Sequence, residues 1–330
     1  MRYRTLGQGL KVSAIGIGCM PMIREGNINY GQANDDVSTR TIHEAIDLGI
    51  TFFDTAELYG PFTNEELVGQ AIKDRRDGLV IATKFAMAWD GNTPTGVDGN
   101  PTNARRACEG SLKRLGIDTI DLFYQHRVDP NVPIEETIGG MAELVKEGMV
   151  RHLGLSEAAA DTVRRAAKVH PIAVLQSEYS IWERDVEDDI LAACRENGIG
   201  FVPYSPLGRG FLAGGIRSLD ELPANDWRRN DPRYSPENML KNLAIVDAIA
   251  DVAVRHGVSN AQIALAWLLA QGDDIVPIPG VKRSQTMRDS AGAPDVALTA
   301  GDFATIESAA PSGNTAGPRY AEAGMARVKL

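Results

Sequence analysis

Four residues of the kind that transfer protons follow strand-like runs in the first half of the chain. Asp54 closes the apolar run at residues 50–55, and Tyr59 follows within one short loop. Lys84 and His126 come at the ends of two later runs of the same kind. A buried carboxylate at the end of a strand needs a cation or several hydrogen-bond donors near it. If these strands meet at one barrel mouth, then the carboxylate, phenol, ammonium and imidazole form one proton-transfer site.

The elements that must position these side chains are repeated strand and helix units. Short Val-, Ile- and Leu-rich runs alternate with segments of helical periodicity, which is typical of a parallel sheet covered by helices. We predict an α/β fold, a (β/α)8 TIM barrel, because eight is the number of strands that closes such a barrel. The strand-like runs are residues 12–19, 50–55, 78–85, 119–126, 149–156, 172–178, 199–205 and 274–280. Helices are expected over residues 35–49, 63–74, 102–116, 133–148 and 238–257.

Further polar side chains follow the later strands of the predicted barrel. Ser156, Gln176 and Tyr204 fall at or just beyond the ends of successive strand-like runs. Chemistry in a barrel of this kind gathers where strands end and loops begin. A single aromatic residue, ion pair or histidine in such a place is as often structural as functional. The repeated placement therefore carries more weight than any one residue.

A single domain is expected to span residues 1–330, because the strand-like runs continue regularly across both interruptions of the pattern. These interruptions, at residues 86–101 and 205–234, are predicted to be long loops at the carboxyl face of the barrel, and long loops are usually functional. Residues 2–13 are expected to form a small hairpin that plugs the bottom of the barrel. The tail from about residue 311 either covers the pocket or hangs free, and sequence leaves both open.

The overall composition excludes several classes of partner. A formal net charge of −10 argues against general binding to nucleic acid or anionic membranes. Cys19, Cys108 and Cys194 are far apart and have no CxxC spacing, so we expect neither disulfides nor a metal site. The chain opens without the apolar stretch of a signal peptide, and no run approaches the roughly 18 apolar residues of a membrane helix. We therefore expect a cytoplasmic protein.

Nine motifs follow one another along nearly the whole chain: IGIGCMPM, FFDTAELYG, ATKF, IDLFYQHRVDP, VRHLGLSEA, LQSEYSIWERD, VPYSPLGRGFL, ALAWLLAQ and VPIPGVKR. In this order they resemble the aldo-keto reductase superfamily. The likeness is greatest to the branch that includes perakine reductase and auxin-induced-protein-like reductases. The resemblance implies a (β/α)8 barrel that reduces carbonyl compounds with a nicotinamide cofactor.

Carbonyl reduction requires a hydride on carbon and a proton on oxygen, so a site for it must supply a polarising donor. Tyr59 is the candidate general acid. A free phenol has a pKa near about 10, and an adjacent ammonium such as Lys84 lowers that value. Asp54 would keep Lys84 charged and oriented, while His126 donates to the carbonyl oxygen or relays the proton. By resemblance these four are the catalytic tetrad.

The cofactor is expected to bind without a Rossmann motif, since no GxGxxG follows a strand. The glycine-rich loop after Tyr204 offers backbone amides and one arginine to a pyrophosphate. By resemblance Tyr204 stacks on the nicotinamide, and Ser156, Glu157 and Gln176 hold its carboxamide. Glu157 replaces the Asn of many relatives and needs a donor partner. The predicted contacts in the loop are Ser205, Pro206, Leu207, Gly208, Arg209 and Gly210.

A basic cluster follows the last strand-like run. Lys282 and Arg283 precede a predicted helix, and cations at a helix N-terminus form an anion site. We infer that they bind the 2′-phosphate of NADP(H), although a solvated basic face is the simpler alternative. The adenine is expected near Thr286, Asp289 and Ser290. Gly18, Met20, Asp54 and Gly280 complete the predicted cofactor contacts.

The substrate is expected to be a small-molecule carbonyl compound that contacts Tyr59, Trp89 and His126. Met20, Trp182 and Trp227 are as consistent with loop packing as with a substrate rim. The sequence leaves open whether the protein is a monomer or a homo-oligomer. Two other functions stay open: an NADPH-binding regulatory subunit with weak catalysis, and an aldolase or lyase that uses Lys84 as a Schiff-base nucleophile.

Overall fold

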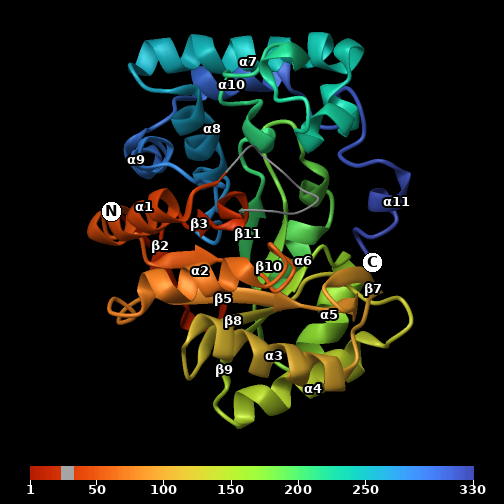
Figure 1. Ribbon diagram of the computed structural model, residues 1–330. Helices are drawn as coiled ribbons and strands as arrows, with labels where there is room; N and C mark the ends of the chain where they lie inside the picture. The colour runs from red at the N-terminus through yellow and green to blue at the C-terminus, as the bar shows by residue number, and fades with distance from the viewer. Residues whose placement is uncertain (24–32) are drawn as a thin grey trace.

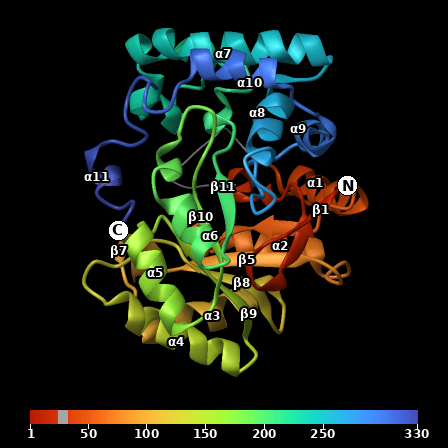
Figure 2. The same cartoon turned by 180° about the vertical axis from the view of Figure 1, so that it is seen from behind.

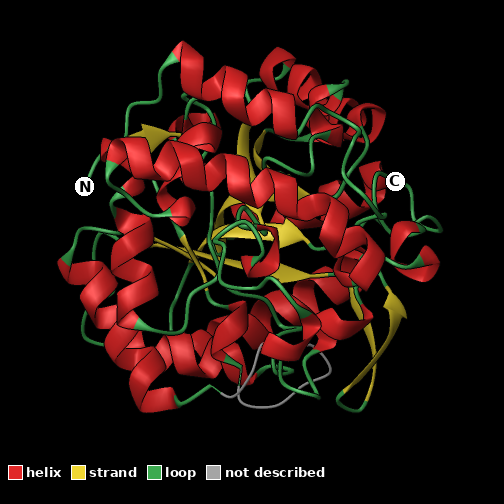
Figure 3. Cartoon of the chain, turned by 90° about the horizontal axis from the view of Figure 1, so that it is seen from above, coloured by secondary structure: helices red, strands yellow, loops and turns green. Residues whose placement is uncertain are grey.

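A parallel sheet forms the centre of the molecule. The computed structural model describes residues 1–23 and 33–330, and within them the strands lie inside a ring of helices (Figure 3). The seven strands of the sheet follow the order β11-β10-β9-β8-β5-β4-β3, and all neighbouring pairs are parallel. They are β3 Ile17–Gly18, β4 Phe52–Asp54, β5 Val80–Phe85, β8 Ile120–Gln125, β9 Val150–Ser156, β10 Ile172–Glu178 and β11 Gly200–Tyr204.

The eighth strand-like run closes this sheet into a barrel. Residues 274–280 lie between β11 and β3 and form parallel bridges from Ile275 to Phe201 and from Gly280 to Gly18. The run does not form a regular strand, because Pro277 and its neighbour Pro279 have no N–H to donate to a ladder. The predicted (β/α)8 barrel is therefore confirmed, with its last strand reduced to an irregular segment.

Helices cover the outside of the barrel (Figure 1). The predicted helices are present within a few residues of their expected ends, and the glycines that follow α3 and α7 adopt the left-handed conformation that ends a helix. Helices α3, α4 and α5 pack against β5, β9 and β10 respectively (Figure 2). The helices are α1 Asp35–Asp47, α2 Thr63–Ile72, α3 Pro101–Leu115, α4 Ile134–Lys146, α5 Ala160–Val169, α6 Ile190–Glu196, α7 Pro236–His256, α8 Asn260–Leu269, α9 Ser284–Ala291, α10 Ala300–Ala309 and α11 Glu322–Met325.

The N-terminal hairpin closes the bottom of the barrel. Strands β1 (Tyr3–Thr5) and β2 (Lys11–Ser13) pair in antiparallel fashion, as predicted. Leu6, Leu10 and Val12 are buried in one cluster with apolar side chains of the barrel strands. The hairpin thereby supplies the apolar surface that seals this end of the barrel against water.

The two interruptions after β5 and β11 have more structure than their composition predicts. Residues 86–101 contain a second antiparallel hairpin, formed by β6 (Met87–Asp90) and β7 (Thr93–Val97), where we expected only a loop. Its Gly, Pro and Asp residues are depleted in strands, so the pattern gave no strand signal. Residues 205–234 form a loop with short 3-10 turns, held by the backbone bonds of those turns.

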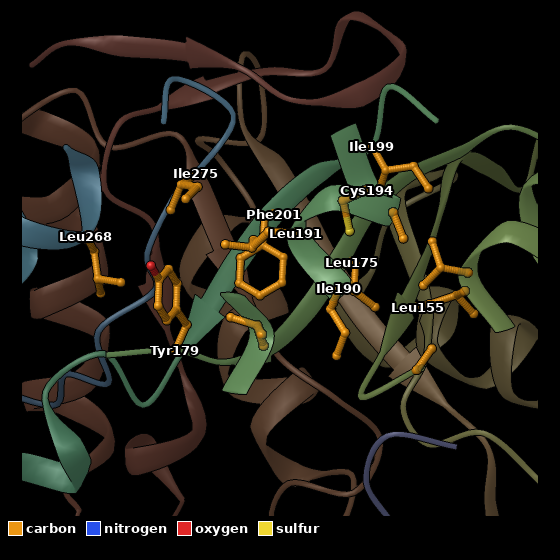
Figure 4. Close-up of a cluster of buried hydrophobic side chains, with 14 of the residues drawn as sticks. Leu155, Leu175, Tyr179, Ile190, Leu191, Cys194, Ile199, Phe201, Leu268 and Ile275 are labelled. Carbon is orange, nitrogen blue, oxygen red and sulfur yellow. The ribbon is translucent and has the colours of Figure 1, made fainter. Parts of the chain in front are cut away.

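The largest apolar cluster lies between the sheet and the helices around β9 to β11. In Figure 4, Leu155, Leu175 and Phe201 from these strands face Ile190 and Cys194 from α6. All three cysteines of the chain are buried and free. Burial raises the pKa of Cys194 to about 12, so its thiol packs as an apolar group and not as a nucleophile.

The hairpin seal can be tested at Gly7. A methyl group there would meet the carbonyl oxygens of Ala173 and Gly198, the latter at 2.6 Å. We expect Gly7→Ala to lower the free energy of unfolding by about 1–3 kcal/mol, measured by urea denaturation. The matched control is Gly139→Ala in α4, where a methyl group meets nothing within 4 Å. That variant should keep or slightly raise the stability, and equal losses in both would contradict a tight seal.

Candidate active site

Lys84 is the centre of a buried hydrogen-bonded cluster at the carboxyl end of the barrel strands. Its ammonium donates to Asp54 Oδ1 at 2.5 Å, to the Thr55 carbonyl at 2.8 Å and to the Tyr59 hydroxyl at 3.1 Å. The side chains of Lys84 and Asp54 are almost fully excluded from solvent. Because an ammonium has three N–H donors, all three are used, and the position of the nitrogen is fixed.

The Asp54 carboxylate is held from two sides. Its second oxygen accepts from Gln176 Nε2 at 2.7 Å, across the barrel from β10. Burial raises the pKa of Asp54, and Lys84 and Gln176 oppose that rise. Burial alone would lower the pKa of Lys84, but Asp54 and Tyr59 outweigh it, so that pKa lies above its ordinary value. We therefore treat Lys84 as a permanent cation at neutral pH.

Tyr59 reaches this cation from the loop between β4 and α2. The Lys84 nitrogen also lies 4.8 Å from the centre of the Tyr59 ring. Burial raises the pKa of the Tyr59 phenol, and the positive charge of Lys84 opposes the increase. Asn64, in the first turn of α2, fixes the loop by accepting from Thr55 Oγ1 at 2.7 Å and donating to the Cys19 carbonyl at 3.0 Å.

His126, directly after β8, presents its ring edge-on to Tyr59. The two ring centres are 5.9 Å apart and the planes cross at 84°. Burial, together with the charges of Arg127 and Lys84, lowers the pKa of His126 well below its ordinary value, so the imidazole is neutral. Its Nδ1 is buried and has no hydrogen-bond partner among the residues that the structure describes. A buried polar atom without a partner in the protein is suited to a ligand.

The geometry thus brings together the four residues that the sequence predicts. Comparison with known proteins then identifies the family. Residues 14–311 match the Aldo/keto reductase family. The chain belongs to the aldo/keto reductase family. It is an oxidoreductase that acts on carbonyl groups, and enzymes of this family act on small molecules and generally use nicotinamide cofactors.

Several relatives support this membership. A curated relative, "Probable aldo-keto reductase 1" of Glycine max, is 47% identical over 314 residues, which cover 95% of this chain and 90% of that protein. The glycerol dehydrogenase AKR11B4 of Gluconobacter oxydans superposes with a TM-score of 0.84 at 28% identity, over 93% of this chain and 94% of that one. The holo form of the aldo-keto reductase AKR11C1 of Bacillus halodurans superposes with a TM-score of 0.75 at 26% identity, over 95% of this chain and 97% of that one.

The aldo/keto reductase site continues at the ends of β9 and β11. Ser156 Oγ accepts from Arg127 Nη1 at 3.3 Å, which links the ends of β8 and β9. The hydroxyl of Tyr204 lies 2.8 Å from that of Tyr320 in the C-terminal tail. Of the three side chains expected near a carboxamide, Gln176 is instead bonded to Asp54 and therefore joins the Lys84 cluster.

Glu157 has the partner that the sequence could not identify. Arg319 donates to both of its carboxylate oxygens, at 2.5 and 3.2 Å, and both side chains are almost fully buried. The backbone N–H of Glu178 also donates to Glu157 at 3.0 Å. Glu157 itself has a φ of 57°, in the left-handed region that few non-glycine residues adopt. The pairing of an acidic strand-end residue with the tail therefore offsets the cost of burying its charge.

The tail that carries Arg319 is bound along its length. Thr315 Oγ1 donates to the Trp182 carbonyl at 2.6 Å, and Ala316 exchanges two hydrogen bonds with the Asn242 side chain. Further along, Lys329 Nζ pairs with Asp185 at 2.6 Å. Sequence periodicity could not detect this segment, since its contacts are scattered polar pairs and not an apolar face.

The glycine-rich loop after β11 holds its arginine in a buried network. Arg209 pairs with Glu178 at 3.0 Å and with Asp231 at 2.5 Å, so its charge is shared with two carboxylates. We expected this guanidinium beside a pyrophosphate, and in the structure it is paired with these two acidic residues. Gly208 has a φ of 55°, and a Cβ there would lie 2.6 Å from the Trp182 ring, so only glycine fits. The remaining predicted loop residues, Ser205, Pro206, Leu207 and Gly210, adjoin it in the chain.

Positive charges gather where residues 280–283 approach the same loop. Burial lowers the pKa of Lys282, and the nearby charges of Arg283 and Arg228 lower it further, while Asp226, the ion-pair partner of Arg228, opposes this change. Cations that repel one another are stabilised by an anion bound between them, so such a cluster favours anion binding. Arg283 lies just before the first residue of α9, whose N-terminus adds a partial positive charge.

The predicted adenine contacts are already bonded within the protein. Asp289 accepts from Ser259 Oγ at 2.7 Å, and Ser290 Oγ donates to the Thr286 carbonyl at 3.0 Å. Gly18 and Gly280 pair directly as the barrel closes, and Met20 follows in a short 3-10 turn. All six of these predicted residues therefore take part in the protein's own structure.

Trp89 and Trp182 lie in different surroundings. Trp89 in β6 packs on Phe62 with ring centres 4.7 Å apart and donates to Glu57 at 3.3 Å, close in sequence to Tyr59. Trp182, in contrast, is buried and stacks on Phe211 at 5.0 Å, so it serves loop packing. Within residues 1–23 and 33–330, we find neither a helix able to cross a membrane nor a group of metal-binding side chains.

The pair formed by Glu157 and Arg319 can be tested by its removal. Arg319→Met leaves the Glu157 carboxylate buried without a cation, so we expect a loss of about 3–5 kcal/mol in the free energy of unfolding. The double variant Arg319→Met with Glu157→Gln removes that isolated charge and should recover most of the loss. Urea denaturation measures both. A double variant no more stable than Arg319→Met alone would contradict the pairing.

Proposed function

We propose that this protein reduces aldehydes and ketones to alcohols with NADPH, and that Tyr59 is the general acid. The observation that carries this proposal is the position of the Lys84 ammonium, 3.1 Å from the Tyr59 hydroxyl and fixed by Asp54. A cation beside the hydroxyl stabilises the phenolate that remains after proton donation. Asp54 acts through Lys84 and is a positioning residue.

The nicotinamide ring, when bound, supplies the hydride. Tyr59 then donates its O–H proton to the carbonyl oxygen as negative charge develops there. A neutral His126 adds an N–H donor to the same oxygen without competing for the proton. Its unpartnered Nδ1 and its edge-on contact with Tyr59 fit this role.

The described residues fit an NADP(H) cofactor. Lys282 and Arg283, at the N-terminus of α9 and beside Arg228, would hold the 2′-phosphate, because a dianion relieves the repulsion among these cations. The strand-end residues Ser156 and Tyr204 would hold the nicotinamide end. The backbone of the glycine-rich loop at 205–210 would hold the pyrophosphate.

Two other functions fit less well. A Schiff-base lysine must be a neutral amine before it attacks a carbonyl, whereas the pKa of Lys84 is raised by its buried carboxylate partner. A regulatory subunit would share the fold and the cofactor site, and tight NADPH binding without turnover on a broad panel of carbonyl compounds would favour it.

Replacement of Tyr59 by Phe tests the proton donor. Phe keeps the ring beside Lys84 but removes the O–H, so we expect carbonyl-dependent oxidation of NADPH to fall by about 10²–10⁴-fold. NADPH binding, measured by titration of the protein fluorescence, should change little. Tyr3→Phe is the matched control, because the Tyr3 hydroxyl is exposed and bonds only to the Gly49 carbonyl. Full activity in Tyr59→Phe would eliminate the proposed role.

Replacement of Lys282 and Arg283 by Ala tests the cofactor preference. Each charge-assisted contact to a phosphate contributes about tenfold or more in affinity, so we expect the Kd for NADPH to rise by about 10–100-fold in the double variant. The Kd for NADH should stay nearly constant. Lys241→Ala, which removes an exposed lysine paired with Glu237, is the control. A preference for NADH in the unmodified protein would contradict the assignment.

A further inference from the structure

Arg127 is a cation at the mouth of the barrel that forms no ion pair with any carboxylate of residues 1–23 and 33–330. It directly follows His126, and its Nη1 donates to the His126 carbonyl at 2.7 Å and to Ser156 Oγ at 3.3 Å. Among the described residues these are its hydrogen bonds, and none of the ion pairs between them includes Arg127. The side chain is only partly buried, and no described residue accepts a hydrogen bond from Nε or Nη2.

The carboxylates of this end of the barrel form ion pairs with cations other than Arg127. Glu157 is the nearest candidate, but Arg319 binds both of its oxygens. Asp54 is bound by Lys84 and Gln176, and Glu178 pairs with Arg209. In the described part of the chain, the site therefore carries a positive charge that its own carboxylates do not balance.

The surroundings of Arg127 consist largely of phenols. Burial lowers the pKa of its guanidinium, while Tyr204, Tyr320 and Glu157 raise it and outweigh the burial. Tyr59 also interacts with this charge. The charge of Arg127 thus interacts with the phenol that the proposed reaction uses, in a setting where an anion would gain a charge-assisted and partly desolvated hydrogen bond.

We propose that Arg127 binds a carboxylate of the substrate, and that the preferred substrates are oxo acids, carbonyl compounds that carry a carboxylate. This inference rests on the proposed function, since it places the carbonyl oxygen at Tyr59 and His126. A planar guanidinium with its Nε–Nη2 edge unused recognises the planar carboxylate specifically. Arg127 is then a specificity-determining residue that leaves the chemistry at Tyr59 unchanged.

The experiment compares acids with their neutral esters. The probes are 4-carboxybenzaldehyde and succinic semialdehyde, each beside its methyl ester, with NADPH held at saturation. We expect the unmodified protein to have a kcat/KM at least about tenfold higher for the acid of one pair or both, since one charge-assisted contact is of this size. Arg127→Met should abolish that preference, with the change mainly in KM. Arg127→Lys should restore part of it.

Controls separate the possible failures. Arg164→Met removes an exposed arginine paired with Glu196 and should keep the acid preference unchanged. The Kd for NADPH should be the same in Arg127→Met as in the unmodified protein. Esters reduced as well as the acids, or an equal loss on acids and esters in Arg127→Met with weakened NADPH binding, would overturn the inference while leaving the reductase function intact. If none of the four compounds is reduced, the result counts against both the role of Arg127 and the proposed reductase function.

Discussion

The buried pairing of Lys84 with Asp54 is the interaction on which the rest of the site depends. Both side chains are almost fully excluded from solvent, and removal of either partner leaves the other as an isolated buried charge, at a cost of about 3–5 kcal/mol. Such a pair is stable only when the remaining donors and acceptors are also satisfied. The Thr55 carbonyl and Gln176 meet this requirement, and the Tyr59 hydroxyl completes it. The ammonium is thus held beside the hydroxyl that we propose as the proton donor.

The barrel makes this arrangement possible by joining strands that are distant in sequence. Asp54 and Gln176 belong to β4 and β10, on opposite sides of the sheet order, and they meet because the barrel closes. A second group of buried ion pairs lies near the ends of β9, β10 and β11: Glu157 with Arg319, and Arg209 with Glu178 and Asp231. In these pairs, the carboxylates near the mouth of the barrel are bound to Arg319 and Arg209. Among the described residues, no carboxylate then forms an ion pair with Arg127. If Arg127 binds the substrate as proposed, the packing of the tail influences the choice of substrate.

The sequence predicts the barrel and the four proton-transfer residues because both follow from local patterns. Apolar runs identify the strands, and the ends of parallel strands lie on one face whatever the loops do. The hairpin β6–β7 is not predictable in this way, because its Gly, Pro and Asp residues are depleted in strands. The docked tail is not predictable because its contacts are polar and non-local. Arg209 illustrates the same limit: its place in a glycine-rich loop indicates a phosphate ligand, and only the fold reveals its two carboxylate partners. Gln176, likewise, is identified as a site residue by its position, while its bond to Asp54 required the closed barrel.

The coupling between Asp54 and Lys84 is most directly measured by a double-mutant cycle on kcat with saturating NADPH and carbonyl substrate. The cycle comprises Asp54→Asn, Lys84→Met and the combination of the two, each with a thermal unfolding curve to verify folding. If Asp54 acts through Lys84, then the double variant should lose no more activity than Lys84→Met alone, so the two effects are strongly non-additive. Losses that simply add would show that the two residues act independently, and would contradict the central role of the pair.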